Sequence, residues 1–291
     1  MKRITCQNED NVLIEFSYDE DADFFLETLD GAYSVTNNVV TSANTMTDGS
    51  TYQGSTTIQR NLVITASFDN DYQERRDFLY RAFKPKSTGT FTYYEDEEVR
   101  EIDYKVESIE IDEKGVVRNA VISLICPDPF FKDIQESSVA MAGWVPGFEF
   151  VHEFKAEGEE FGTRVAEKVK TIENDTAADN IGITIEIEAT GPVTNPAIHH
   201  QEEDYYIKLG TAENPFVMTA GEILRITTGT NEKNVYLIET DDTETKINEY
   251  LDEGSDFIQL VHGLNTFIYE ADGGVDYMNV TISYRFRYLG V

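Results

Sequence analysis

The stretch from residue 61 to residue 131 constrains the fold more than any other part of the sequence. It begins with the alternating segment Asn61–Phe68, continues with an amphipathic segment that ends at Lys84-Pro85, and finishes at Cys126-Pro-Asp-Pro-Phe-Phe131. Alternation of apolar and polar residues is typical of a strand with one face on a core. The segment order is therefore strand, helix, hairpin, strand, and it includes none of the residues that a catalytic site would need.

The amphipathic segment predicts a helix over residues 71–84. Asp71 is placed to accept hydrogen bonds from the first-turn amides, and Glu74 three residues later can complete a capping box. Pro85 ends the helix because the residue before a proline is disfavoured in the helical region. The apolar stripe, which we expect to pack on a sheet, contains Phe78, Leu79, Ala82 and Phe83.

Two further local patterns lie in the first half of the chain. Residues 104–111 and 117–126 alternate on either side of the polar loop 112–115, whose glycine can take a positive φ, and they predict a hairpin. Residues 31–59 are polar and rich in Thr, Ser and Asn. A loop of this length is uncommon inside a compact domain unless it has a function, so we expect either an arm that reaches a neighbouring molecule or a mobile surface loop.

The β pattern stops near residue 132, where we place a domain boundary. We expect a mainly β protein with two β-sandwich-type domains: residues 1–132, with the helix and the arm, and residues 133–291. Residues 271–275 predict a hairpin between the last two strands, whereas the pattern does not explain residues 151–179. Seven short strands are predicted in the second domain: Ile181–Glu188, Tyr205–Leu209, Glu222–Thr228, Val235–Glu239, Phe257–Val261, Thr266–Glu270 and Val280–Phe286.

The charge of the chain excludes several classes of partner. With 55 acidic and 23 basic residues its net charge is −32, so we expect no binding to nucleic acid, whose phosphates it would repel. The sequence has no apolar run of about 18 residues and no signal peptide, which argues against membrane insertion. Cys6 and Cys126 lie far apart in the sequence, and this usage favours free buried thiols over a disulfide.

No pattern typical of an enzyme is present in the sequence. The four histidines form no His-Glu-x-x-His motif, and there is no Gly-x-Ser-x-Gly elbow, phosphate-binding glycine-rich loop or dinucleotide fingerprint. His199 and His200 are adjacent on an expected strand, so their rings should point to opposite faces and cannot share one metal ion. We therefore expect a protein that is not an enzyme and that has no catalytic, cofactor-binding or metal-ligating residues.

Several segments, taken in order, carry a family resemblance over most of the chain. They are Arg60–Phe68, Arg75–Tyr80, Phe91–Tyr94, Ser123–Phe131, Thr194–Ile198, Gly263–Tyr269 and Val280–Phe286. Together they resemble the distal tail proteins of siphophages that infect Gram-positive bacteria. In that family the first domain ends with a strand and a similar Cys/Pro/Asp-Pro turn, and a long β-rich second half follows. The last two segments resemble its terminal hairpin.

The resemblance implies a structural protein of the virion. Members of the family form a hexameric ring at the tip of the tail, which joins the tail tube protein to the tail-associated hub protein. Residues 31–59 match the position of an arm that clasps the next subunit. The second domain resembles galectin-like or carbohydrate-binding sandwiches, which dock a receptor-binding protein or hold a cell-wall glycan. The implied location is the virion tail, assembled in the cytoplasm of the bacterial host.

Two sets of residues are candidates for interaction sites. Arginine suits interface ion pairs because its planar group binds carboxylates through two hydrogen bonds, although each candidate could be a lone surface arginine. The ring-interface candidates are Arg60, Arg75, Arg76 and Arg81, with Arg100 and Arg118 in the same half. Exposed aromatic rings are platforms for sugars, although aromatic residues on strands usually pack in a core. The candidate sugar-platform residues are Trp144, Tyr205, Tyr206, Tyr236 and Tyr250.

Tyr205 and Tyr206 are neighbours on one expected strand, so one of them should face the core and the other the solvent. Two other classes of protein remain open. A stand-alone carbohydrate-binding protein would be a monomer at all concentrations, with measurable affinity for glycans. A secreted glycan-cleaving enzyme would lose its activity when a single carboxylate is substituted, and the sequence nominates no such residue.

Overall fold

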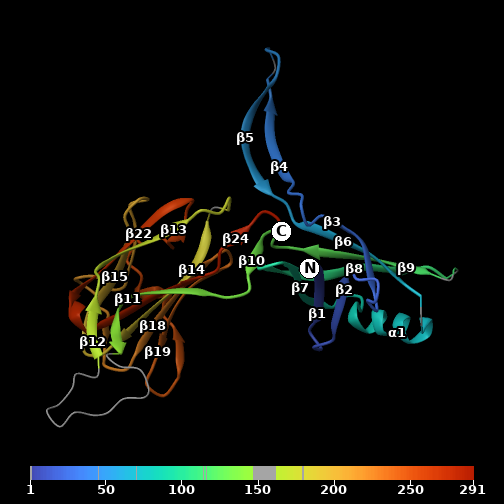
Figure 1. The fold of residues 1–291 in the computed structure, drawn as a ribbon. Coiled ribbons are helices and arrows are strands. Elements are labelled where there is room, and N and C mark those ends of the chain that lie inside the picture. Colours follow the sequence, from blue (N-terminus) through green and yellow to red (C-terminus); the bar gives the residue numbers. More distant parts are fainter. Residues whose placement is uncertain are drawn as a thin grey trace, which may run out of the picture. The chain divides into compact units, whose positions relative to one another are not determined.

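The computed structural model describes residues 2–44, 46–69, 71–113, 115, 117–146, 162–178 and 180–291. Within these residues the fold is mainly β and contains a single α-helix (Figure 1). The chain divides into two compact units. Unit 1 comprises Met1–Ile134 and Arg287–Val291, and unit 2 comprises Gln135–Phe286. The last five residues therefore belong with the first unit, whereas the sequence pattern extends the second domain to residue 291.

Unit 1 is built on one nine-stranded sheet. Its strands are β1 (Arg3–Asn8), β2 (Leu13–Ser17), β3 (Phe25–Asp30), β6 (Arg60–Phe68), β7 (Thr88–Glu95), β8 (Glu98–Ile111), β9 (Arg118–Cys126), β10 (Phe131–Asp133) and β24 (Arg287–Tyr288). The strand order is β24-β10-β8-β7-β1-β2-β3-β6-β9, and β8 also pairs with β9. Because β8 and β9 pair, the seven strands β8-β7-β1-β2-β3-β6-β9 form a closed barrel. The sequence pattern had predicted a sandwich for this domain.

The length of β8 explains how the barrel closes. Residues 98–105 of β8 pair with β7, and residues 105–111 pair with β9, with a register shift between Val106 and Ser108. One strand therefore serves two neighbours, because the irregularity lets it bend from one to the other. The predicted hairpin of residues 104–126 is confirmed as the β8–β9 pair.

Helix α1 (Tyr72–Ala82) packs its apolar stripe against the barrel. Leu79, Ala82 and Phe83 are buried, as the pattern predicts. The predicted capping box is wrong: Asp71 has left-handed backbone angles (φ 47°, ψ 45°), and its side chain makes no capping hydrogen bond. A side-chain cap normally needs an extended N-cap residue. The helix ends at Ala82, where the amide of Phe83 donates to the carbonyl of Leu79.

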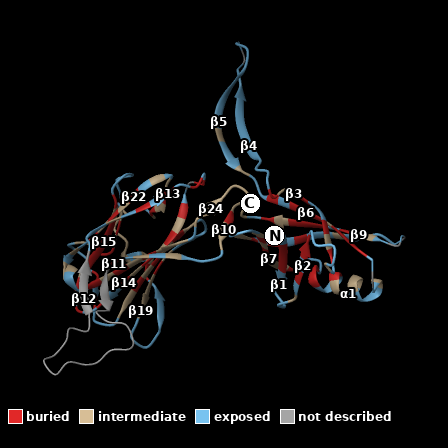
Figure 2. Ribbon diagram, in the orientation of Figure 1, coloured by how far each residue is buried: buried red, intermediate tan, exposed pale blue. Residues whose placement is uncertain are grey.

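The segment between β3 and β6 forms a hairpin of its own. Strands β4 (Asn37–Ala43) and β5 (Ser50–Thr57) pair with each other and belong to none of the three larger sheets. Figure 1 shows this hairpin projecting from unit 1, and Figure 2 shows that most of it is exposed. We call the pair of strands β4 and β5 the arm; both lie within the polar segment 31–59.

Both cysteines are free and buried in unit 1, which confirms the expectation from the sequence. Burial raises the pKa of Cys126 to about 12, and burial also raises the pKa of Cys6, with the nearby Cys126 adding to the effect. Both thiols are therefore protonated at neutral pH.

Unit 2 is a sandwich of two sheets around one apolar core. The larger sheet contains β11 (Ser137–Pro146), β12 (Gly162–Ala166), β14 (Ile181–Ala189), β18 (Ile223–Gly229), β19 (Glu232–Ile238), β20 (Glu244–Lys246), β21 (Gln259–Leu260) and β23 (Met278–Tyr284). The smaller sheet contains β13 (Val169–Asn174), β15 (Val193–His200), β16 (Tyr205–Lys208), β17 (Val217–Met218) and β22 (Gly263–Gly273). All seven predicted strands are present. Strands β12 and β13 account for part of the unexplained segment 151–179, and residues 147–161 lie outside the described residues.

The predicted hairpin over residues 271–275 is wrong. Strand β22 pairs with β13 and β15 in the smaller sheet, whereas β23 pairs with β11 and β14 in the larger one. The two strands are joined by a short 3-10 turn, Val275–Tyr277, that crosses from one sheet to the other. For the same reason the last two matched segments are not a terminal hairpin. Among the helices described, none is long and apolar enough to cross a membrane.

Candidate functional site

The arm exposes large apolar side chains to solvent. Val39, Val40 and Tyr52 are 56%, 50% and 62% exposed. Within the described residues, the outer edges of β4 and β5 have no strand partner, so both edges offer unpaired backbone groups. An open edge of this kind is a template for pairing with another chain, and exposed apolar side chains on it favour an interaction surface.

Arg60 is buried in unit 1 and stabilises residues 31–34, the segment just before β4, which we call the root of the arm. This residue is only 5% exposed, and burial lowers the pKa of its guanidinium. Its Nε donates to the carbonyl of Pro129 at 2.8 Å, its Nη1 to those of Gly31, Ala32 and Ser34 at 2.5, 3.2 and 2.8 Å, and its Nη2 to that of Leu289. The guanidinium therefore ties three separate segments together, and its donors are used within the chain.

The other candidate arginines lie elsewhere in unit 1. Arg75, Arg76 and Arg81 are on α1, where Arg75 pairs with Asp23 and Arg76 with Asp77, each at 2.8 Å. Arg81 is exposed. Among the second group, Arg118 lies over the ring of Tyr72 at 3.8 Å and Arg100 over that of Tyr288 at 4.0 Å. The structure therefore brings three of the four ring-interface candidates onto one helix and leaves Arg60 apart from them.

The C-terminal segment 287–291 completes unit 1. Strand β24 pairs with β10, Arg287 forms an ion pair with Asp128, and Nη1 of Arg100 donates to the carbonyl of Gly290 at 2.6 Å. Arg60 and Leu289 are 229 positions apart in the sequence. No local pattern in the sequence could indicate that these two residues meet.

The candidate sugar-platform residues do not come together. Tyr236 lies on β19 of the larger sheet, and Tyr250 packs against the core beside Phe216. Trp144 lies on β11, and its side chain is outside the described part of the structure. Tyr205 and Tyr206 lie on opposite faces of β16, as predicted: Tyr206 is paired with His199 on the outer face, and Tyr205 with the buried His200. Tyr205 is nevertheless 45% exposed because it begins the strand, and the first buried residue of β16 is Ile207.

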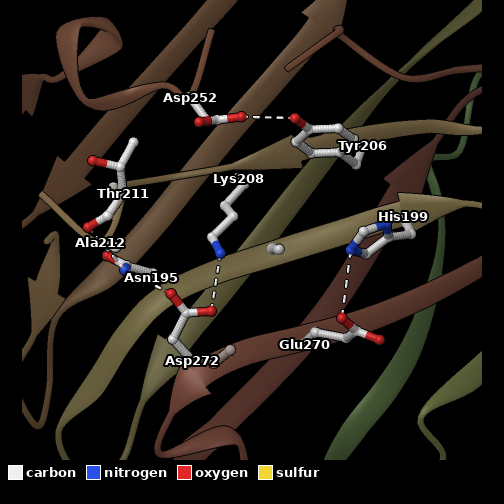
Figure 3. Close-up of a pocket in the computed structure, with 12 residues that line it drawn as sticks. Asn195, His199, Tyr206, Lys208, Thr211, Ala212, Asp252, Glu270 and Asp272 are labelled. Atoms are coloured by element: carbon white, nitrogen blue, oxygen red, sulfur yellow. Dashed lines mark hydrogen bonds and ion pairs between the residues drawn. The ribbon is translucent and has the colours of Figure 1, made fainter. Parts of the chain in front are cut away.

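Tyr206 lines a pocket of about 410 Å³ on the outer face of the smaller sheet (Figure 3). Ala197 of β15 forms its floor. The neighbours of Ala197 in the sheet are Lys208 of β16 on one side and Glu270 of β22 on the other. The pocket exists because a methyl group stands between two long side chains. We call it the Ala197 pocket.

Charged and aromatic pairs form the walls of the Ala197 pocket. The rings of His199 and Tyr206 are stacked with their centroids 5.6 Å apart. Figure 3 shows polar pairs among the lining residues. They include Tyr206 with Asp252 at 2.7 Å, Lys208 with Asp272 at 2.9 Å, and His199 with Glu270 at 3.6 Å.

Hydrogen bonds reinforce the ordinary charge states of two of these groups. The bond to Asp252 raises the pKa of Tyr206, and bonds from Asn195 and Lys208 lower the pKa of Asp272. The tyrosine is therefore neutral and Asp272 is ionised at neutral pH. Three carboxylates face one ammonium group around this pocket, so its charge is negative. Sequence reasoning found Tyr206 alone; the alternation of Asn195, Ala197 and His199 on one face of β15 was the available signal for the rest.

His199 and His200 lie on opposite faces of β15, as predicted: His200 is buried and His199 lines the pocket. Across the part of the chain that the structure describes, no three His, Cys, Asp or Glu side chains form a group that could hold a metal ion.

Two family models match this chain. Residues 13–126 match the phage tail protein RIFT-related domain, and residues 176–288 match the C-terminal domain of the siphovirus-type tail component. The first match lies within unit 1, and the second covers unit 2 from residue 176 to its end and also β24 of unit 1. The chain is therefore a structural component of a siphophage tail. Among curated protein sequences, none matches it.

Solved structures share the fold of the whole chain. The Dit protein (gp 19.1) of phage SPP1, described as a paradigm of the hub adsorption apparatus in phages that infect Gram-positive bacteria, matches with a TM-score of 0.68 and 14% identity over 98% of this chain and 99% of its own. A chain of the phage P2 baseplate in its activated conformation matches with a TM-score of 0.50 and 12% identity over the full length of both. The chain belongs to the distal tail protein family of siphophages, which confirms the resemblance seen in the sequence.

Proposed function

We propose that six copies of this chain form a closed ring at the tail tip, which joins the tail tube protein to the tail-associated hub protein and supports host adhesion. The observation that carries the proposal is the arm, an exposed β-hairpin with apolar side chains and two open edges. In the ring, each arm clasps the next copy by adding its edge to a sheet of that copy. Pairing of this kind supplies main-chain hydrogen bonds between subunits.

The charge of the chain supports an arm that binds through apolar and main-chain contacts. Six copies with a net charge of −32 each would carry −192, six times the charge of one. Such a ring cannot depend on a surplus of cations, since acids outnumber bases by more than two to one. Arg60 serves the assembly indirectly in this proposal, because it holds the root from which the arm extends. Arg75, Arg76 and Arg81 on α1 remain the proposed basic contacts.

The proposed location is the virion tail, after assembly in the cytoplasm of the bacterial host. The protein acts there as a connector and not as an enzyme. Unit 2 faces the exterior in this proposal and docks a receptor-binding protein or a cell-wall glycan. The family membership and the fold support this location, and the strands of unit 2 supply a wide surface for such a partner.

Light scattering after size-exclusion chromatography tests the ring. We expect a mass of about 198 kDa, which is six times the 33.0 kDa of one chain. The double variant Val39→Asp, Val40→Asp places two further charges on the arm and should elute as a monomer. Val117→Asp is the matched control, because Val117 is 57% exposed but lies outside the arm, and this variant should keep the ring.

Two outcomes contradict the proposal. One is a natural chain that is monomeric at every concentration, which would favour a stand-alone carbohydrate-binding protein. The other is a double arm variant that assembles as well as the natural chain, which would exclude the arm as the clasp.

A further inference from the structure

We propose that the Ala197 pocket is a binding site for a sugar unit that is uncharged or carries an amino group. The inference rests on the glycan-docking role proposed above for unit 2 and assigns to that role a pocket and a class of sugar. It does not depend on the ring, because it concerns residues of unit 2 alone. The volume of about 410 Å³ lies within the range of roughly 300–1,000 Å³ that small-molecule sites occupy.

The walls of the pocket match the chemistry of a sugar. A sugar hydroxyl both donates and accepts hydrogen bonds, so it can insert between a donor and an acceptor that already face each other. Lys208 with Asp272 and His199 with Glu270 are two such pairs, on either side of Ala197. The stacked rings of His199 and Tyr206 offer an apolar surface to the C–H groups of a sugar ring.

The charge of the pocket selects among sugars. Asp252, Glu270 and Asp272 contribute three carboxylates, while Lys208 contributes the ammonium group among the lining residues. A phosphorylated or acidic sugar would be repelled by this excess of negative charge. A neutral sugar would not be, and an amino sugar would gain an ion pair. The site therefore discriminates by charge as well as by shape.

The site is built in advance of binding. Asn195 is 3% exposed and is fixed by three contacts: its side-chain oxygen accepts from the amide of Phe216 at 2.8 Å, and its side-chain nitrogen donates to Asp272 at 2.8 Å and to the carbonyl of Thr211 at 3.3 Å. Asp272 is thereby held in place for Lys208. Groups that are already ordered lose little entropy when a ligand binds.

Titration calorimetry and saturation-transfer NMR with the full chain test the proposal. The probes are glucose, galactose, N-acetylglucosamine and glucosamine, with glucose 6-phosphate as the acidic comparison. We expect at least one of the first four to bind with a Kd of about 1 mM, and glucose 6-phosphate to bind at least about tenfold more weakly. Ala197→Leu fills the floor and should abolish binding.

Further variants separate the pocket from general damage to the fold. Glu270→Gln changes an exposed carboxylate without altering its shape and should weaken binding about tenfold, which is a loss of about 1.4 kcal/mol. Tyr236→Ala, on the other sheet, should bind as the natural chain does. The Val39→Asp, Val40→Asp chain should also bind normally, so that failure of the ring and failure of this site are distinguishable. The inference is overturned if none of the four sugars binds, if binding persists in Ala197→Leu, or if glucose 6-phosphate binds equally well.

Discussion

Replacing Arg60 with methionine should destabilise unit 1 and loosen the root of the arm. Methionine keeps most of the apolar stem but removes every donor, so the carbonyls of Gly31, Ala32, Ser34, Pro129 and Leu289 lose their shared partner. A hydrogen bond from a charged donor contributes about 1.5–3 kcal/mol, so five such bonds exceed about 7 kcal/mol before any compensation.

Two effects reduce that sum. Removing the charge relieves the desolvation of a buried guanidinium, which costs several kcal/mol, and some of the freed carbonyls will be reached by water. We therefore expect Arg60→Met to lower the free energy of unfolding by about 3–5 kcal/mol. The free energy of unfolding of Arg60→Lys should lie between those of Arg60→Met and the natural chain, because an ammonium group has three donors at one point and cannot span all five carbonyls.

Urea unfolding of the full chain gives the magnitude, and hydrogen exchange with mass spectrometry gives the location. Peptides over residues 31–36, 127–131 and 287–291 should exchange faster in Arg60→Met, while peptides of unit 2 should not change. Arg3→Met is the matched control, since Arg3 pairs with Glu15 at the surface of unit 1, and it should cost less than about 1 kcal/mol. The reasoning is refuted if Arg60→Met costs less than about 1 kcal/mol or leaves exchange at the arm root unchanged.

Two further predictions concern other residues of unit 1. Gly31→Ala should lower the melting temperature strongly, because an added Cβ would lie 1.9 Å from the carbonyl oxygen of Asn61, and because the φ of +84° is already unfavourable for other residues. Gly49→Ala is the control: its φ of +94° is similar but the space around it is open, so this variant should cost only about 1 kcal/mol. Burial raises the pKa of both cysteines, that of Cys126 to about 12, so neither should react with a thiol reagent in the folded chain between about pH 7 and 9. Both should react once urea unfolds the chain. Rapid labelling of the folded chain would contradict the buried environment.

The sequence predicted best those features whose causes lie within a few residues. The β8–β9 hairpin and the buried stripe of α1 follow from alternation, a glycine turn and helical spacing, and both are present. The capping box also looked local, but it depends on the backbone angles of Asp71, and sequence spacing cannot specify these. Gly273 and Gly274 similarly indicate a turn without indicating which sheet the next strand joins. Pairing with distant strands determines which sheet a strand joins. Because β22 pairs with β15 and β23 pairs with β14, the two strands lie in different sheets and form no hairpin.

The same limit explains what the sequence could not predict about the candidate sites. The floor of the Ala197 pocket is a small residue between two long ones, and the three side chains come from strands that meet only in the folded sheet. Arg60 looked like a surface cation because arginine usually is one. Its burial requires a cage of carbonyls from residues 31–34, 129 and 289, and these are assembled by the closed barrel and by β24.

Arg60 also connects the division of the chain into units with the proposed function. Unit 2 is inserted in the sequence between β10 and β24, so unit 1 is complete only when the chain has passed through unit 2 and returned. The returning segment supplies Leu289 to the guanidinium that holds Gly31 and Ser34 at the root of the arm. The full set of contacts of Arg60 at the root of the arm therefore forms only in a chain that continues through unit 2 to residue 289. In the proposed ring, this arrangement favours the clasp of full chains, because a fragment that stops at residue 134 would lack both β24 and one of the five carbonyl partners of Arg60.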